Sequence, residues 1–177
     1  MRQGFFATAA LALGTVLASG CSTLEVNTDY APGTDFGKYK TFTIKRGTAP
    51  KNTLAADRVE ASLASALAAR GLTRVPDGGD LLLVPHFSLG KDVQLNSYGY
   101  GGWGGWRWGG GMQTTQVQEI PTGTLVIDLV DSKTNTAVWR GIAKDQISTT
   151  ATPEERQQKA DEVARQLFAN FPPGSKK

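Results

Sequence analysis

The only cysteine of the chain, Cys21, follows an apolar leader and two small residues, and no other feature constrains the rest of the chain as much. Met1-Arg2 gives a positive start. Gly4 to Leu17 form an apolar stretch that is short, and rich in Ala, Gly and Thr, for a membrane span. Small residues keep the backbone extended for a peptidase, and the thiol is the nucleophile that accepts a diacylglyceryl group. The sequence therefore predicts a lipoprotein signal peptide over residues 1–20 and lipidation of Cys21.

Two alternatives stay open for the leader. Ala18-Ser19-Gly20 could be a general secretory cleavage site that leaves Cys21 as a plain thiol, or the leader could stay attached as a membrane anchor. Lipidation is favoured because the lone cysteine falls where acylation needs it. A single acyl chain anchors weakly, whereas two or three chains, palmitate among them, would hold the domain firmly. Ser22, where Asp would signal inner-membrane retention, favours the periplasmic face of the outer membrane.

Without residues 1–20, 157 of the 177 residues remain, which is enough for one domain with a core. The formal net charge of the whole chain is +3, and both signs are interspersed apart from Lys176-Lys177. Nucleic acid is therefore not an expected partner. If Cys21 is acylated, the domain has no thiol left for a disulfide or for catalysis, and packing must stabilise it.

Alternating apolar residues and turn residues predict several strands. The expected strands are residues 24–28, 38–44, 72–75, 80–84, 114–120, 124–130 and 137–147. The apolar run 80–84 is expected to be buried on both faces. The clearest strand is 124–130, with Leu125, Ile127 and Leu129 on one side, followed by a hairpin connection over 131–135.

Two helices are expected. The first begins with Asn52 or Thr53 as cap, runs to about Arg70 and ends before Gly71. The second begins at Thr152-Pro153-Glu154-Glu155, which combines a threonine cap, a proline at the first position and a capping-box glutamate. Because strands outnumber helices, the predicted fold is α+β: a mostly antiparallel β-sheet with two helices packed on one face, plus a Gly/Trp-rich irregular loop.

The expected organisation has a short N-terminal tether and a single domain. Residues 21–35 are the lipidated N-terminus with the first strand, 36–173 the α+β domain, and 174–177 a C-terminal tail. A strand that starts a few residues after the lipid would hold the domain close to the membrane, because each residue spans at most ~3.5 Å.

Several motifs together resemble one family of bacterial lipoproteins, domain of unknown function 4136. The motifs are Asp35-Phe36, Tyr39-Lys40-Thr41-Phe42, Asp80-Leu81, Gly123-Thr124-Leu125 through Asp131, Val138-Trp139-Arg140-Gly141 and Phe171-Pro172-Pro173. The resemblance covers essentially the whole chain after the leader. It implies an envelope lipoprotein of α+β fold, and it implies neither an activity nor catalytic residues.

An irregular loop is expected over residues 90–112, and its centre, Tyr98–Gly111, is chemically unusual. Eight of these fourteen residues are Gly and five are aromatic. The candidate contact residues are Tyr98, Tyr100, Trp103, Trp106, Arg107 and Trp108. Gly99 to Gly104 formally matches a dinucleotide-binding fingerprint, but no βαβ unit surrounds it and we reject the match.

Three interpretations of this loop remain open. It could be an insertion whose rings fold back onto the domain. It could contact the membrane, since Trp and Tyr prefer the headgroup level. It could also form a stacking surface for the sugar rings of an envelope glycan, or for a protein.

His86 is the only histidine, and one histidine without cysteines does not complete a zinc site, so no metal or cofactor is expected. No Gly-x-Ser-x-Gly motif or other catalytic set is recognised. Asp128 is expected to pair with Arg140 across the hairpin, and Trp139 to lie in the core. The leading hypothesis is a non-enzymatic outer-membrane lipoprotein that binds or braces an envelope component through the loop. The alternative is an envelope hydrolase that uses His86 with a carboxylate.

Overall fold

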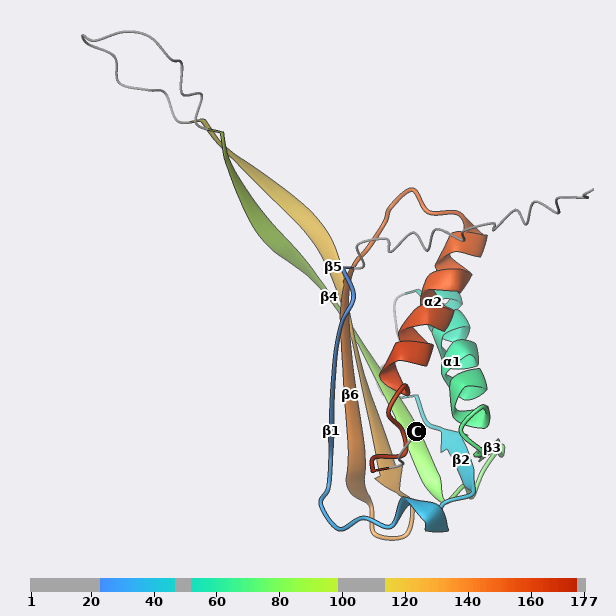
Figure 1. Cartoon of the computed structure of the whole chain (residues 1–177). Helices are drawn as coiled ribbons and strands as arrows, with labels where there is room; N and C mark the ends of the chain where they lie inside the picture. Colours follow the sequence, from blue (N-terminus) through green and yellow to red (C-terminus); the bar gives the residue numbers. More distant parts are fainter. Residues whose placement is uncertain (1–22, 47–51, 99–113, 175–177) are drawn as a thin grey trace, which may run out of the picture.

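The structure, a computed structural model, describes residues 23–46, 52–98 and 114–174. The elements are β1 (Glu25–Tyr30), the 3-10 helix η1 (Phe36–Lys38), β2 (Thr41–Ile44), α1 (Thr53–Ala68), β3 (Thr73–Arg74), β4 (Leu81–Tyr98), β5 (Thr114–Asp131), β6 (Thr136–Gln146) and α2 (Pro153–Leu167). The strands form one sheet in the order β1-β6-β5-β4-β2-β3, and both helices cover the same face of it (Figure 1).

The sheet is mostly antiparallel. β1 pairs with β6, β6 with β5 and β5 with β4, all antiparallel, whereas β2 pairs parallel with both β3 and β4. The parallel pairing requires a crossover, which α1 supplies between β2 and the next two strands. The predicted fold class, a mostly antiparallel sheet with two helices on one face, is confirmed.

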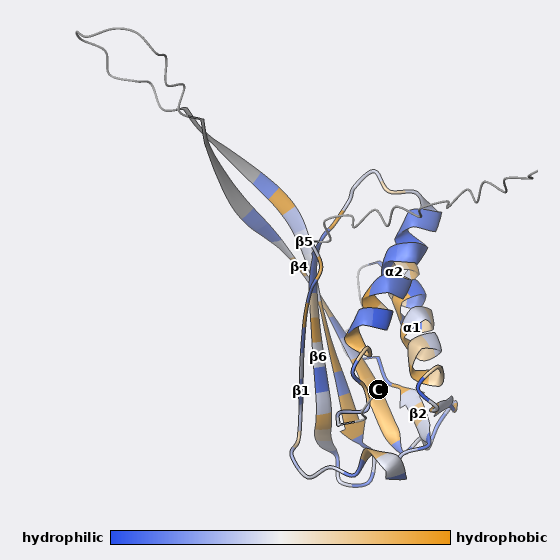
Figure 2. Cartoon of the chain, viewed as in Figure 1, coloured by the Kyte–Doolittle hydropathy of each residue, from blue (hydrophilic) through white to orange (hydrophobic). Residues whose placement is uncertain are grey.

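The core fills the space between the sheet and the helices, where Figure 2 shows the apolar residues gathered. Leu125, Ile127 and Leu129 of β5 alternate into it, as the period-2 pattern predicted. Trp139 of β6 stacks on Phe168, with ring centroids 5.1 Å apart, and is buried as expected. Aromatic stacking therefore fixes the end of α2 to the middle of the sheet.

Both helices begin where the sequence placed their caps. The Asn52 side chain accepts a hydrogen bond from the N–H of Ala55. At α2, Thr152 and Glu155 form a complete capping box, with proline in the first turn. These bonds satisfy N–H groups that the helix itself leaves free.

The expectation that residues 80–84 are buried on both faces is wrong. Leu81 and Leu83 are fully buried beneath the helices, whereas Leu82 and Val84 on the other face are partly exposed. In the part of the chain that the structure describes, no second layer covers that face of the sheet. The run is apolar on both sides, but only one side is packed.

The expectation of an irregular segment from residue 90 is also wrong for residues 90–98, which continue β4. They pair in register with 114–122 of β5, from Gly90↔Thr122 to Tyr98↔Thr114. β5 is likewise one continuous strand rather than two. β6 ends at Gln146, the partner of Thr122, so residues 91–98 and 114–121 form a two-stranded ribbon beyond the sheet (Figure 1). We call this ribbon the arm. At ~3.4 Å per residue it extends about 24 Å.

Candidate functional site

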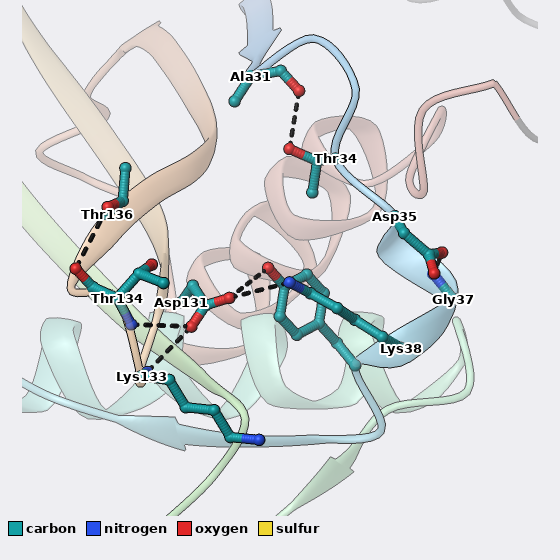
Figure 3. Close-up of polar contacts among 10 residues, drawn as sticks. Ala31, Thr34, Asp35, Gly37, Lys38, Asp131, Lys133, Thr134 and Thr136 are labelled. Carbon is teal, nitrogen blue, oxygen red and sulfur yellow. Dashed lines mark hydrogen bonds and ion pairs between the residues drawn. The ribbon is translucent and has the colours of Figure 1, made fainter.

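Asp131 is the centre of a polar cluster at the end of the sheet opposite the arm (Figure 3). Its carboxylate accepts hydrogen bonds from the Tyr39 hydroxyl at 2.8 Å and the Lys38 ammonium group at 3.2 Å. The backbone N–H groups of Lys133 and Thr134 donate to its other oxygen, at 2.9 and 3.2 Å. These donors, the Tyr39 hydroxyl above all, hold the pKa of the Asp131 carboxyl well below its usual range.

This cluster joins segments that are distant in the sequence, because η1 and the start of β2 meet the β5–β6 turn there. Burial raises the pKa of Tyr39, and hydrogen bonds with Tyr39 and Asp131 raise that of Lys38. The adjoining pocket, which Asp80 and Lys133 also line, is about 100 Å³. That volume is well below the size of a ligand pocket. The cluster is therefore suited to stabilising the fold rather than to binding a substrate.

Asp80 performs a similar structural role at the start of β4. Its carboxylate accepts from the backbone N–H of Lys40 at 2.9 Å and of Thr41 at 3.0 Å, and from the Thr41 hydroxyl at 2.9 Å. These bonds, the one from Lys40 first, lower the pKa of Asp80. The preceding Gly79 lies against the backbone of Phe42, where an added Cβ would come within 2.6 Å of the carbonyl carbon. Asp80 and Gly79 thus fix the parallel register of β2 and β4.

His86, the expected base of the hydrolase alternative, lies on the uncovered face of β4. Its Nε2 is 3.9 Å from Oδ2 of Asp128, too far for a hydrogen bond. Arg140 instead donates to both Asp128 oxygens, at 2.6 and 2.9 Å, which confirms the expected cross-strand pair. That bidentate contact raises the pKa of Arg140. The structure therefore brings a histidine near a carboxylate, but the carboxylate is already neutralised by the guanidinium group.

The expected contact residues mostly lie outside the described part of the chain. Cys21, Tyr100, Trp103, Trp106, Arg107 and Trp108 all fall there. Tyr98 is the last residue of β4, and its backbone pairs with Thr114. In the chain, residues 99–113 connect Tyr98 and Thr114, the two strand ends of the arm.

Polar residues also gather at the end of the sheet where the arm begins. The Thr23 hydroxyl donates to Oδ1 of Asp145 at 2.5 Å, while Lys159 of α2 lies 2.7 Å from Oδ2 of the same carboxylate. Lys144 pairs with Asp92 of the arm at 2.8 Å. An open pocket of about 240 Å³ lies among these groups. The described chain thus enters the domain beside the base of the arm.

The described part of the chain contains no candidate metal site and no candidate membrane-spanning helix. Among residues 23–46, 52–98 and 114–174, no three His, Cys, Asp or Glu side chains are grouped to hold a metal ion. No helix in these same ranges is long and apolar enough to cross a membrane.

Sequence reasoning missed the Asp131 cluster and the Thr23–Asp145 contact. Asp131 was expected only as a turn former, a role it does fill through Lys133 and Thr134. Its contact with Tyr39 joins positions 92 apart, which no local pattern encodes. Tyr39 and Asp131 both lie in the motifs that carried the family resemblance, and that shared membership was the only sequence signal for their contact.

Comparison with protein families gives one match. The family model described as Domain of unknown function (DUF4136) matches residues 26–173, which is most of the chain. No curated protein sequence matches the chain.

Several solved structures are similar in fold. A PDZ domain protein from Parabacteroides distasonis has a TM-score of 0.55 and 14% identity; the match covers 88% of this chain and 38% of that one. The chain thus spans well under half of that protein. A PelC dodecamer from Paraburkholderia phytofirmans has a TM-score of 0.49 and 13% identity, and the match covers 82% of this chain and 95% of that one. A minor lipoprotein from Acinetobacter baumannii has a TM-score of 0.41 and 17% identity, and the match covers 75% of this chain and 91% of that one. At 14% identity, the match to the PDZ domain protein indicates a similar fold and nothing about function.

Proposed function

The chain belongs to the family Domain of unknown function (DUF4136), and we propose that it is a lipoprotein anchored by Cys21 to the periplasmic face of the outer membrane. In this proposal it is a non-enzymatic module that contacts another envelope component, a glycan or a protein, or the membrane itself. The contact is made by Tyr98, Tyr100, Trp103, Trp106, Arg107 and Trp108 at the end of the arm.

The arm is the observation that carries this proposal. Residues 91–98 and 114–121 pair with each other and with no further strand of the described chain. An isolated two-stranded ribbon is only marginally stable in water. The arm therefore adds little to the stability of the domain, which favours a role in contact. The paired ends of the ribbon, Tyr98 and Thr114, lie about 24 Å beyond the sheet, and the chain between them is rich in Trp and Tyr. Large amphipathic rings are the side chains most often found at binding hot spots.

The position of Thr23 indicates which end of the domain an anchor on Cys21 would hold. Thr23 is two residues from Cys21 and is hydrogen-bonded to Asp145 at the arm end of the sheet. A lipid on Cys21 would therefore hold that end at the membrane, with a tether of only about 7 Å.

The hydrolase alternative is less well supported. His86 is half exposed on one face of a strand, and Asp128 is held by both nitrogens of Arg140. A general base is usually oriented by its carboxylate partner through a hydrogen bond, which 3.9 Å does not provide. Activity lost in His86→Ala, with folding unchanged, would restore this alternative.

Photo-crosslinking in living cells tests the proposed contact. A benzophenone amino acid replaces Trp106 in the full-length chain, and a matched variant carries it at Ser132, which is exposed in the β5–β6 turn at the opposite end. We expect a discrete crosslinked product from position 106 that is missing from position 132. Equal products from both positions, or none from 106, would contradict contact through the end of the arm.

A further inference from the structure

Three large apolar side chains are exposed together at the arm end of the sheet: Phe87, Leu89 and Ile147, with 38%, 78% and 39% of their surface exposed. Phe87 and Leu89 continue the alternation that buries Leu81 and Leu83, so they lie on the helix side of the sheet, beyond the part that the core fills. We call these three residues the apolar end patch.

The patch is continuous rather than scattered. Leu89 pairs with Gly123 of β5, and Ile147 packs over that glycine, since an added Cβ at Gly123 would lie 3.1 Å from Ile147 Cδ1. Glycine at this position therefore leaves room for the isoleucine side chain over β5, next to the strand position that Leu89 occupies on β4. Exposed apolar residues that occur singly need no explanation, but a contiguous group indicates a contact surface.

The same row of the sheet holds the entry point of the chain. Leu89 pairs with Gly123, and Gly123 pairs with Asp145, which accepts the hydrogen bond of Thr23. Neighbouring strands are about 4.8 Å apart, so the backbones of Leu89 and Asp145 are about 10 Å apart. Cys21 precedes Thr23 by two residues, which span no more than about 7 Å of chain. An acylated Cys21 would therefore bring the bilayer to within about 20 Å of Leu89.

We propose that the apolar end patch rests on the lipid bilayer, so that the domain is held at the membrane by the patch as well as by its acyl chains. This inference rests on the proposed lipid anchor. The bilayer is the occupant that the geometry favours, because the anchor fixes it beside the patch.

The charges around the patch indicate an apolar contact rather than an electrostatic one. Lys144 pairs with Asp92, and Lys159 with Asp145. Lys91 pairs with Glu119 of the arm at 2.5 Å. Because these ammonium groups are neutralised within the protein, binding through the patch is expected to be insensitive to salt.

Spin labelling of the lipidated full-length protein in vesicles of phosphatidylethanolamine and phosphatidylglycerol tests this inference. Acylated Cys21 has no free thiol, so a nitroxide attaches only at an introduced cysteine. Leu89→Cys carries the probe, and Ser132→Cys at the other end of the sheet is the control. We expect collision with oxygen relative to a nickel chelate to be several-fold higher at position 89 than at 132. Raising salt from about 0.1 M to about 1 M should leave this ratio unchanged.

Equal, water-like ratios at both positions would overturn the inference. So would a label at position 89 that is shielded from both reagents and depends on protein concentration, since a second copy would then cover the patch. Ile147→Cys repeats the measurement if Leu89→Cys does not fold. Mass spectrometry of the same preparation separates the two proposals. An unmodified Cys21 would refute the anchor, whereas an acylated Cys21 with a water-exposed label would refute only the bilayer contact.

Discussion

At the scale of single residues, the Asp131 carboxylate accepts four hydrogen bonds and joins Lys38 and Tyr39 to the β5–β6 turn. Because its folded-state pKa is lowered, its stabilising contribution is complete above the ordinary carboxyl pKa near 3.8 and is lost as pH falls toward the folded value. We expect Asp131→Asn to lower the unfolding free energy at pH 7, and the difference from wild type to shrink below about pH 4. Urea unfolding across this pH range measures it. A difference that is constant with pH would contradict the ionic role of Asp131.

Gly141 is the residue whose size is most tightly constrained in β6. An added methyl group would overlap the ring of Trp139 and lie 2.9 Å from Cδ2 of Leu167. We expect Gly141→Ala to destabilise the domain by about 1–3 kcal/mol through overpacking. Gly90→Ala is the matched control, because its Cβ would meet only the Thr122 hydroxyl at 3.3 Å, and it should change stability by less than about 0.5 kcal/mol. Equal losses in thermal unfolding would argue against the packing explanation.

At the scale of elements, the capping box predicted α2 well because both of its bonds are local. We expect Thr152→Ala to cost about 1 kcal/mol, since the N–H of Glu155 loses its acceptor. Thr150→Ala, in the same exposed connection but outside the cap, should cost less than about 0.5 kcal/mol. Chemical denaturation of the three proteins checks this. Equal stability of both variants would mean that α2 is held by its packing alone.

The strands show where sequence patterns stop being informative. Leu125, Ile127 and Leu129 were predictable because alternation records which face is buried. Residues 90–98 were not, because their strand exists through pairing with 114–122, a partner that a glycine-rich connection separates from it in the chain. The parallel pairing of β2 with β4 is equally non-local, since α1 and β3 lie between them in the chain. The same holds for the candidate site: the residues of the loop were visible, but the arm that carries them was not.

At the scale of the whole molecule, the two ends of the sheet differ in what they carry. The Asp131 cluster closes the end that lies away from the membrane in our proposal. At the opposite end the chain enters through Thr23, the apolar end patch is exposed and the arm departs. A domain that needed the arm for its own stability would have it packed against a helix. In Figure 1 the arm extends beyond the rest of the sheet and beyond the helices, and this supports the proposed role in contact.

This separation predicts that the arm can be removed without unfolding the domain. Replacing residues 93–119 by Asn-Gly, a sequence suited to a two-residue hairpin, would leave β4 and β5 joined next to Asp92 and Ile120, which face each other in the sheet register. We expect the unfolding free energy to change by less than about 1 kcal/mol, because no core residue of the described chain lies in this range and the described ion pair that is lost, Lys91 with Glu119, is exposed. Urea unfolding measures this, and the crosslink from the loop should be lost with the arm. A shortened chain that fails to fold would show instead that the arm is a structural part of the sheet, and the case for it as a contact device would lose its physical basis.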